Sequence, residues 1–166
     1  MPLRPATLDD VTLIQDLANE SWKDTYGKIL SKEQLEYMLD LMYSTQNIVK
    51  QMNQETYHYH IIQNQQLDPV GFIGFETNYE DNTTKLHRLY LIPSAKGLGL
   101  GKTTMNQLKI WTKVYNNNRI ILTVNKNNTA KEMYEKQGFK VYHEGIFDIG
   151  NGYVMDDYLM EYTFGE

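Results

Sequence analysis

The stretch with the clearest potential for chemistry is a glycine-rich segment, LYLIPSAKGLGLGKTTMNQLKIW, at residues 89–111. Gly97, Gly99 and Gly101 alternate with leucine and follow an apolar run that ends at Pro93. Small residues let successive main-chain N–H groups turn towards one anion, and a helix that begins in such a loop adds the positive end of its dipole. The segment therefore predicts a phosphate-binding loop between a strand and a helix.

Two widespread phosphate-binding patterns do not fit this spacing. Gly101, Lys102 and Thr103 copy the end of G-x-x-x-x-G-K-[ST], but the leading glycine would have to stand where the chain has Lys96. The dinucleotide pattern G-x-G-x-x-G would need glycine in place of Lys102 or Thr104. A nucleotide triphosphatase and a dinucleotide-binding enzyme are therefore disfavoured, and a glycine loop that merely turns the chain stays as the alternative.

A second pattern lies further along the chain, in NKNNTAKEMYEKQGF at residues 125–139. Together with the glycine loop, this segment resembles the GCN5-related N-acetyltransferases. The loop signature of that family is [QR]-x-x-G-x-[GA], from which this chain departs only by Lys96, a side chain that is still a cationic donor. The later signature is N-x-x-A-x-x-x-Y-x-x-x-G-F, and the positions in register with it are Asn127, Ala130, Tyr134, Gly138 and Phe139.

Other segments extend this resemblance over most of the chain. The opening LRPATLDDVTLIQDLA is similar to the first strand and helix of the family. More narrowly, WKDTYGKIL, RLYLIPSAKGLGLGK and the predicted final hairpin are similar to bacterial acetyltransferases that act on polyamines such as spermidine and spermine.

The resemblance implies an acetyl-CoA-dependent N-acetyltransferase whose glycine loop holds the pyrophosphate of coenzyme A. It also implies that the strand before the loop separates from its neighbour, so that main-chain groups near Leu89 to Leu91 contact the pantetheine arm and polarise the acetyl carbonyl. Asn127 is implied to be a hydrogen-bond donor to the coenzyme. The complete set expected to bind it is Leu89, Tyr90, Leu91, Lys96, Gly97, Leu98, Gly99, Leu100, Gly101, Lys102, Thr103, Asn127 and Tyr134.

Acetyl transfer to an amine also needs an acid for the departing thiolate and a base for the amine. By resemblance, Tyr134 is the acid, although it also belongs to the apolar stripe of its helix and could simply pack there. His87, on the strand before the loop, is the candidate base because an imidazole can take a proton near neutral pH. Tyr90 is a second candidate and lies on the opposite face if side chains alternate along the strand.

The acceptor site is expected between the first two predicted helices and the strand ends that face the thioester. Trp22, Tyr26 and Glu76 are the main candidates to bind the acceptor, because aromatic rings and carboxylates together can hold an alkyl ammonium. Further polar or aromatic residues in the same segments are Asp24, Glu33, Tyr37 and Asp40. A formal net charge of -5 mildly favours a cationic substrate.

Periodicity predicts the elements that carry these residues. Apolar spacing and capping patterns predict helices at 9–22, from Ser31 to Met42, at 45–54, from the loop to Tyr115, and at 130–137. Alternating, β-branched and aromatic runs predict strands at 2–6, 57–64, 70–79, 86–92, 119–124, 139–149 and 153–164. The fold class is therefore α/β: a mixed, mostly antiparallel sheet of about seven strands with helices on both faces, containing one βαβ crossover around the loop.

Composition narrows the remaining possibilities. The 166 residues are expected to form a single acetyltransferase domain over 1–166. The acidic balance argues against a nucleic-acid binder, and the absence of an apolar segment of membrane-spanning length argues against a membrane partner. No metal site is expected, because the chain has no cysteine and His58 and His60 lack nearby ligands in the sequence. A cytoplasmic location is expected.

The function predicted is transfer of an acetyl group from acetyl-CoA to a primary amine of a small molecule, with polyamines as candidates, by direct attack in a ternary complex. Two alternatives remain open at this point: a protein lysine or N-terminal acetyltransferase, and a non-catalytic acyl-CoA-binding regulatory module. A homodimer is a possible assembly, with no residue pattern that demonstrates it.

Overall fold

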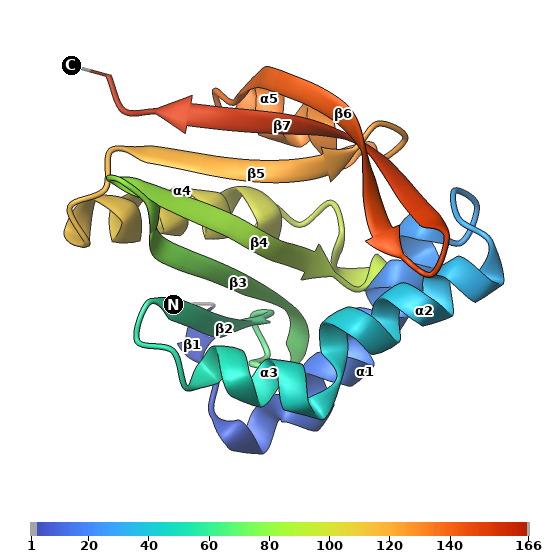
Figure 1. Ribbon diagram of the computed structural model, residues 1–166. Coiled ribbons are helices and arrows are strands. Elements are labelled where there is room, and N and C mark those ends of the chain that lie inside the picture. Colours follow the sequence, from blue (N-terminus) through green and yellow to red (C-terminus); the bar gives the residue numbers. More distant parts are fainter. Residues whose placement is uncertain (1–2, 166) are drawn as a thin grey trace.

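A seven-stranded mixed sheet runs through the computed structural model, which describes residues 3–165 (Figure 1). Its strands are β1 (Leu3–Pro5), β2 (Tyr57–Gln63), β3 (Pro69–Glu80), β4 (Thr83–Leu91), β5 (Arg119–Asn125), β6 (Lys140–Gly150) and β7 (Tyr153–Thr163). The helices are α1 (Val11–Tyr26), α2 (Lys32–Tyr43), α3 (Thr45–Met52), α4 (Leu100–Val114) and α5 (Ala130–Lys136), with short 3-10 turns η1 (Leu8–Asp10) and η2 (Pro93–Ala95). The predicted fold class is confirmed.

The strands are arranged in the order β1-β2-β3-β4-β5-β7-β6, and β4 with β5 is the parallel pair of the described sheet. The other neighbouring strands are antiparallel. A parallel pair requires a crossover, and α4 provides it, as the sequence predicted for the segment around the glycine loop. The final hairpin turns through Asn151 and Gly152, which have φ values of 53° and 79°.

Helices cover both faces of the sheet, so two apolar cores form. One core packs α4 and α5 on the sheet and includes Met105, Leu108 and Tyr134. The other core packs α1, α2 and α3 on the opposite face and includes Ile14 and Trp22. No helix in residues 3–165 has the length and apolarity needed to cross a membrane.

Two predicted boundaries are wrong. Helix α1 continues to Tyr26 instead of ending near 22, because Trp22 and Tyr26 are both buried on its inner face and Gly27 N–H still donates to Lys23 O. The polar turn predicted after residue 77 is shorter than expected, because β3 extends to Glu80 and pairs there with Thr83. The threonines of this segment are therefore strand residues and not turn residues.

β4 and β5 separate part of the way along their length. They pair from Thr83 with Arg119 to Leu86 with Leu122, and then the pairing stops although both strands continue. β4 stays attached to β3 on its other side as far as Leu91. The sheet thus contains a wedge-shaped opening beyond Leu86, which lies beside the start of α4 (Figure 1).

Candidate active site

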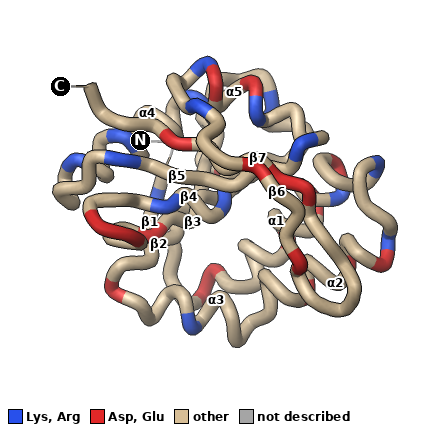
Figure 2. Tube along the Cα trace, turned by 45° about the horizontal axis from the view of Figure 1, so that its top comes forward, with Lys and Arg blue, Asp and Glu red and all other residues tan. Residues whose placement is uncertain are grey.

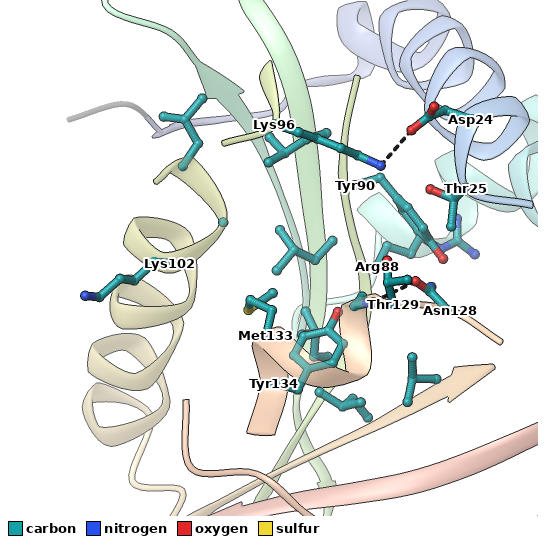
Figure 3. A pocket seen from close by; sticks show the side chains of 18 of the residues that line it. Asp24, Thr25, Arg88, Tyr90, Lys96, Lys102, Asn128, Thr129, Met133 and Tyr134 are labelled. Atoms are coloured by element: carbon teal, nitrogen blue, oxygen red, sulfur yellow. Dashed lines mark hydrogen bonds and ion pairs between the residues drawn. The ribbon is translucent and has the colours of Figure 1, made fainter. Parts of the chain in front are cut away.

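A cavity of about 680 Å³ occupies the opening between β4 and β5 and continues to the glycine loop and the first turn of α4. Side chains from α1, β4, β5 and α5 complete its wall (Figure 3). The predicted site residues that line it are Tyr26, His87, Leu89, Tyr90, Leu91, Lys96, Gly97, Gly99, Leu100, Gly101, Lys102, Asn127 and Tyr134. The folding of the chain therefore brings the two sequence motifs together around one cavity.

Leu98, Thr103, Trp22 and Glu76 were also predicted to belong to the site, and they do not line this cavity. Leu98 is 66% exposed at the tip of the loop. Thr103 N–H donates to Gly99 O within α4, so the main-chain donor of Thr103 is already used. Trp22 and Glu76 each contact a residue of the wall instead, as described below.

The glycine loop presents main-chain donors at the mouth of the cavity. Gly97 and Gly99 have φ values of 81° and 77°, a conformation that side chains of L-residues disfavour. The N–H groups of Gly97, Leu98 and Gly99 donate to no acceptor within residues 3–165. Those of the first residues of α4 have no partner inside a regular helix, so this end of α4 offers several N–H groups and a positive dipole to an anion.

Lys96, the one departure from the loop signature, is held by an ion pair from across the cavity. Its Nζ lies 2.7 Å from Asp24 Oδ2 at the end of α1 (Figure 3). Both side chains are more than a third exposed, so the pair contributes little to stability. The ammonium group nevertheless stands beside the loop donors, where it adds positive charge for an anionic ligand.

Tyr134 lies where α5 meets the opening of the sheet. Its ring packs 5.9 Å from that of Phe139, and the residue is 7% exposed. Burial, with the neighbouring Tyr26, raises the pKa of Tyr134, so the phenol is protonated at neutral pH. Because Tyr134 belongs to the core and also lines the cavity, the packing role and the catalytic role weighed from the sequence are compatible.

Asparagines before α5 fix the other side of the cavity. Asn127 is exposed, and its N–H donates to Asn125 Oδ1 at 2.9 Å. Asn128, which the sequence did not single out, accepts from Ala130 N–H at 2.9 Å and donates through Nδ2 to Tyr26 OH at 3.4 Å. The only sequence signal for Asn128 is its place in the NKNN run just before a helix.

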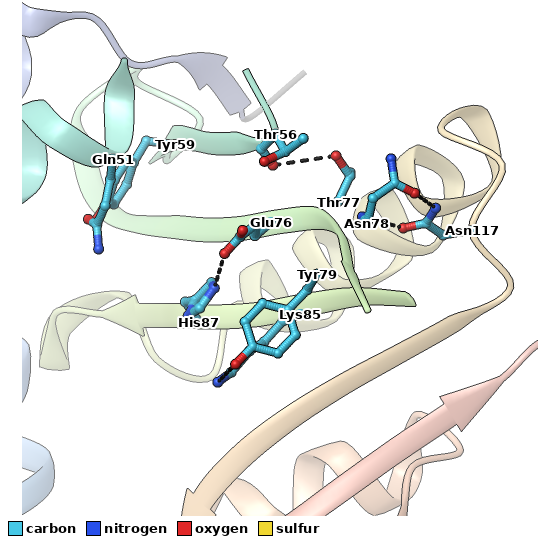
Figure 4. A network of polar contacts seen from close by, with 10 residues as sticks. All are labelled: Gln51, Thr56, Tyr59, Glu76, Thr77, Asn78, Tyr79, Lys85, His87 and Asn117. Atoms are coloured by element: carbon cyan, nitrogen blue, oxygen red, sulfur yellow. Dashed lines mark hydrogen bonds and ion pairs between the residues drawn. The ribbon is translucent and has the colours of Figure 1, made fainter. Parts of the chain in front are cut away.

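His87 sits at a β-bulge in β4. Gly74 of β3 pairs with Arg88 and the next residue, Phe75, pairs with Leu86, so His87 has no partner in the ladder. The imidazole stacks on Tyr57 at 5.0 Å, and its Nε2 lies 3.0 Å from Glu76 Oε1, where a ring N–H donates to the carboxylate (Figure 4). Glu76 therefore contacts the candidate base and does not itself face the cavity.

The bulge corrects the expected alternation along β4. Tyr57 and Tyr90 both pack in the core beneath α1, α2 and α3, so His87 and Tyr90 lie on the same face of the sheet and not on opposite faces. Burial lowers the pKa of His87, and the positive charges of Lys85 and Arg88 act in the same direction. The imidazole is therefore neutral at pH 7, as a proton acceptor must be.

Aromatic residues form the side of the cavity that faces α1. Trp22 packs on Tyr26 at 4.7 Å and on Tyr90 at 5.6 Å, and the hydroxyl groups of Tyr26 and Tyr90 lie 3.5 Å apart. Trp22 is 2% exposed and supports these two rings from behind. Arg88 lies next to this cluster, donates to Tyr59 OH at 2.9 Å and stacks on Tyr43 at 4.5 Å.

Histidines elsewhere in the sheet serve packing. His58 lies 5.0 Å from the ring of Phe75, and His60 lies 4.3 Å from that of Trp111. Burial lowers the pKa of both, and brings that of His60 to about 4. In residues 3–165 no group of three or more histidine, aspartate or glutamate side chains has the geometry of a metal site.

Comparisons with known proteins agree with this geometry. Residues 28–154 match the family model described as acetyltransferase (GNAT) domain. The spermidine N(1)-acetyltransferase of Thermoplasma acidophilum is 28% identical over 141 residues, which are 84% of this chain and 88% of that protein. These matches cover both sequence motifs.

Solved structures share the fold. The PaiA N-acetyltransferase of Thermoplasma acidophilum in complex with coenzyme A is 26% identical, with a TM-score of 0.81 over 98% of each chain. The spermidine/spermine N-acetyltransferase SpeG of Vibrio cholerae is 21% identical, with a TM-score of 0.68 over 97% of this chain and 91% of that one. This second likeness concerns the fold alone.

Proposed function

This chain is a member of the acetyltransferase (GNAT) family, and we propose that it acetylates a primary amine of a small molecule, with acetyl-CoA as donor. One observation carries the proposal: a single cavity connects the donor-rich glycine loop, the opening between β4 and β5, and Tyr134. A diphosphate at one end and a thioester at the other would have the chemistry they need in the same cavity. Acetyl-CoA supplies the activated acetyl group.

The residues present fit coenzyme A. The free N–H groups of residues 97–99 and of the first turn of α4 suit a diphosphate, and Lys96 adds a cation beside them. Along the opening, the unpaired main chain of Leu89 to Leu91 suits the amide groups of a pantetheine arm. Leu98 and Thr103 are the weakest members of the proposed set, because neither lines the cavity.

Two residues are proposed for proton transfer. Tyr134 donates its phenolic proton to the thiolate that leaves when the amine attacks the carbonyl. His87 accepts a proton from the acceptor ammonium, directly or through water, and Glu76 holds the ring orientation through the 3.0 Å contact. Both proton carriers start in the protonation state they need, since burial keeps the phenol neutral and the imidazole unprotonated.

We propose a polyamine as the acceptor. Support comes from the spermidine N(1)-acetyltransferase that matches 84% of this chain, and from the aromatic side chains that Tyr26 and Tyr90 present beside the thioester end of the cavity. Aromatic faces attract alkyl ammonium groups. In this scheme Trp22 contributes by holding Tyr26 and Tyr90, and Glu76 by holding His87.

The direct test is thiol release from acetyl-CoA in the presence of single amines: spermidine, spermine, amino acids, aminoglycosides and peptides with free N-termini. We expect release with polyamines and formation of one acetylated product per thiol. Release with peptides alone would favour a protein acetyltransferase, and coenzyme A binding without turnover of any amine would favour a regulatory module. A single domain over 1–166 and a homodimer are further proposals, which limited proteolysis and sedimentation test.

A further inference from the structure

Asp157 is a buried carboxylate that the proposed reaction has not used. It lies on β7, is 7% exposed, and its Oδ1 is sealed from solvent without a hydrogen-bond donor among the described residues. No ion pair within residues 3–165 involves it, whereas the adjacent Asp156 pairs with Lys126 at 3.0 Å. A buried charge without a partner is costly, so its presence calls for an explanation.

The register of the sheet places Asp157 at the wide end of the opening. β5 and β7 pair in antiparallel register, and Asp157 lies opposite Asn125, the last residue of β5. The contact between β4 and β5 has already ended three residues earlier, at Leu122. Red segments on β6 and β7 in Figure 2 show that acidic residues gather on this hairpin.

Tyr26 connects Asp157 to the cavity. The carboxylate lies close enough to Tyr26 to help raise the pKa of that phenol, and Tyr26 in turn faces Tyr90 and receives the hydrogen bond from Asn128. Tyr26 also influences Tyr134, so it stands between the proposed acid and Asp157. Asp157 is therefore one aromatic side chain away from the place of acetyl transfer.

Charges at the two ends of this aromatic strip have opposite signs. Arg88, a buried cation, lies beside Tyr90, and Asp157 lies beside Tyr26. A cation that enters along the two rings is repelled at the Arg88 end and attracted at the Asp157 end. The strip thus has a direction for a ligand that carries ammonium groups.

We propose that Asp157 binds the non-reacting ammonium group of a diamine or polyamine acceptor. The inference rests on the proposed acetyltransferase function and names its substrate class: an amine with a second positive charge. The ligand's ammonium supplies the cation that the protein does not give this carboxylate, and it leaves the other amino group directed along Tyr26 and Tyr90 towards the thioester. Asp157 is a positioning residue for the acceptor and takes no proton from it.

Steady-state kinetics of Asp157→Asn with 1,4-diaminobutane and with 1-aminobutane test this assignment. Asparagine keeps the shape and removes the charge. We expect the KM for the diamine to rise roughly 10- to 100-fold, as for a lost charged hydrogen bond, with kcat nearly unchanged. The KM of the monoamine, or its inhibition constant where turnover is too slow, should not change.

Asp156→Asn is the matched control, because Asp156 is the neighbouring, largely exposed carboxylate, and it should leave both amines unaffected. Thermal melting establishes that the variants fold. Asp157→Asn should melt at or above the parent temperature at pH 7.5, since it removes a poorly compensated buried charge, and Asp157→Ser provides a second variant.

Three results would overturn the assignment: an unchanged KM for the diamine, an equal loss for diamine and monoamine, or a fall in kcat alone. The last two would point to a structural or a proton-accepting role. Failure of the proposed function is distinct from these results, because then the parent protein itself would release no thiol with any amine.

Discussion

Replacing Gly101 by alanine separates a role in folding from a role in binding. Gly101 has an ordinary φ, and a Cβ there would meet only Met133 Cε at 3.9 Å and Leu91 Cδ1 at 4.0 Å, which are normal contacts. The protein alone therefore has room for the methyl group. Alanine favours a helix over glycine by up to about 1 kcal/mol, which corresponds to a rise in Tm of roughly 2–4 °C for a chain of this size.

Binding of coenzyme A is expected to respond in the opposite direction. If the diphosphate approaches the main chain of the first turn of α4, the added methyl group pushes it away from at least one N–H donor. Hydrogen bonds to a charged group contribute about 1.5–3 kcal/mol, so the Kd should rise roughly 10- to 150-fold. Calorimetry with coenzyme A and a thermal melt of the same preparation measure the two effects.

Gly99→Ala is the control for strain. Its φ of 77° is costly for alanine, although the new Cβ would meet no atom within 4 Å. This variant should lose about 1–2 kcal/mol of stability. A Gly101→Ala protein that is as stable as the parent and binds coenzyme A equally well would refute the reasoning, because the main chain at this turn would then not touch the ligand.

Three further outcomes are expected. Tyr134→Phe should lower kcat by about 10- to 1000-fold while coenzyme A affinity from calorimetry stays unchanged, and equal turnover would exclude Tyr134 as the acid. Asp24→Asn frees Lys96 for the diphosphate and should lower the Kd for coenzyme A roughly 1.4- to 5-fold at low salt, an effect that 0.5 M-range salt should remove; a weaker affinity would contradict it. His60 has a folded pKa of about 4, below its ordinary value, so acid favours the unfolded chain: the free energy of unfolding should fall as pH drops from about 6.5 towards 4, and His60→Gln should flatten that fall in urea titrations.

The motif residues could be found from the sequence because their roles depend on local spacing. Positive φ at Gly97 and Gly99 is a property of a few consecutive residues, and so is the asparagine run before α5. The strand and helix order followed from periodicity for the same reason. Errors occurred where an element continued through long-range packing, as in α1, whose last turn is held by buried Trp22 and Tyr26.

Features that depend on contacts between distant segments could not be found this way. Asp24 pairs with Lys96 across 72 residues of sequence, and nothing near either residue indicates the other. The bulge at His87 follows from the register between β3 and β4, which a strict alternation along β4 misses. Asp157 belongs to a run of alternating strand residues, and only the pairing of β5 with β7 places it at the opening.

A crystal structure of the protein with coenzyme A tests the central claim most directly. The account predicts diphosphate oxygens within about 2.7–3.2 Å of main-chain nitrogens between residues 97 and 102, with the sulfur in the opening between β4 and β5 beside the Tyr134 hydroxyl. A coenzyme bound elsewhere, or bound at this loop with its sulfur turned away from Tyr134, would contradict the account.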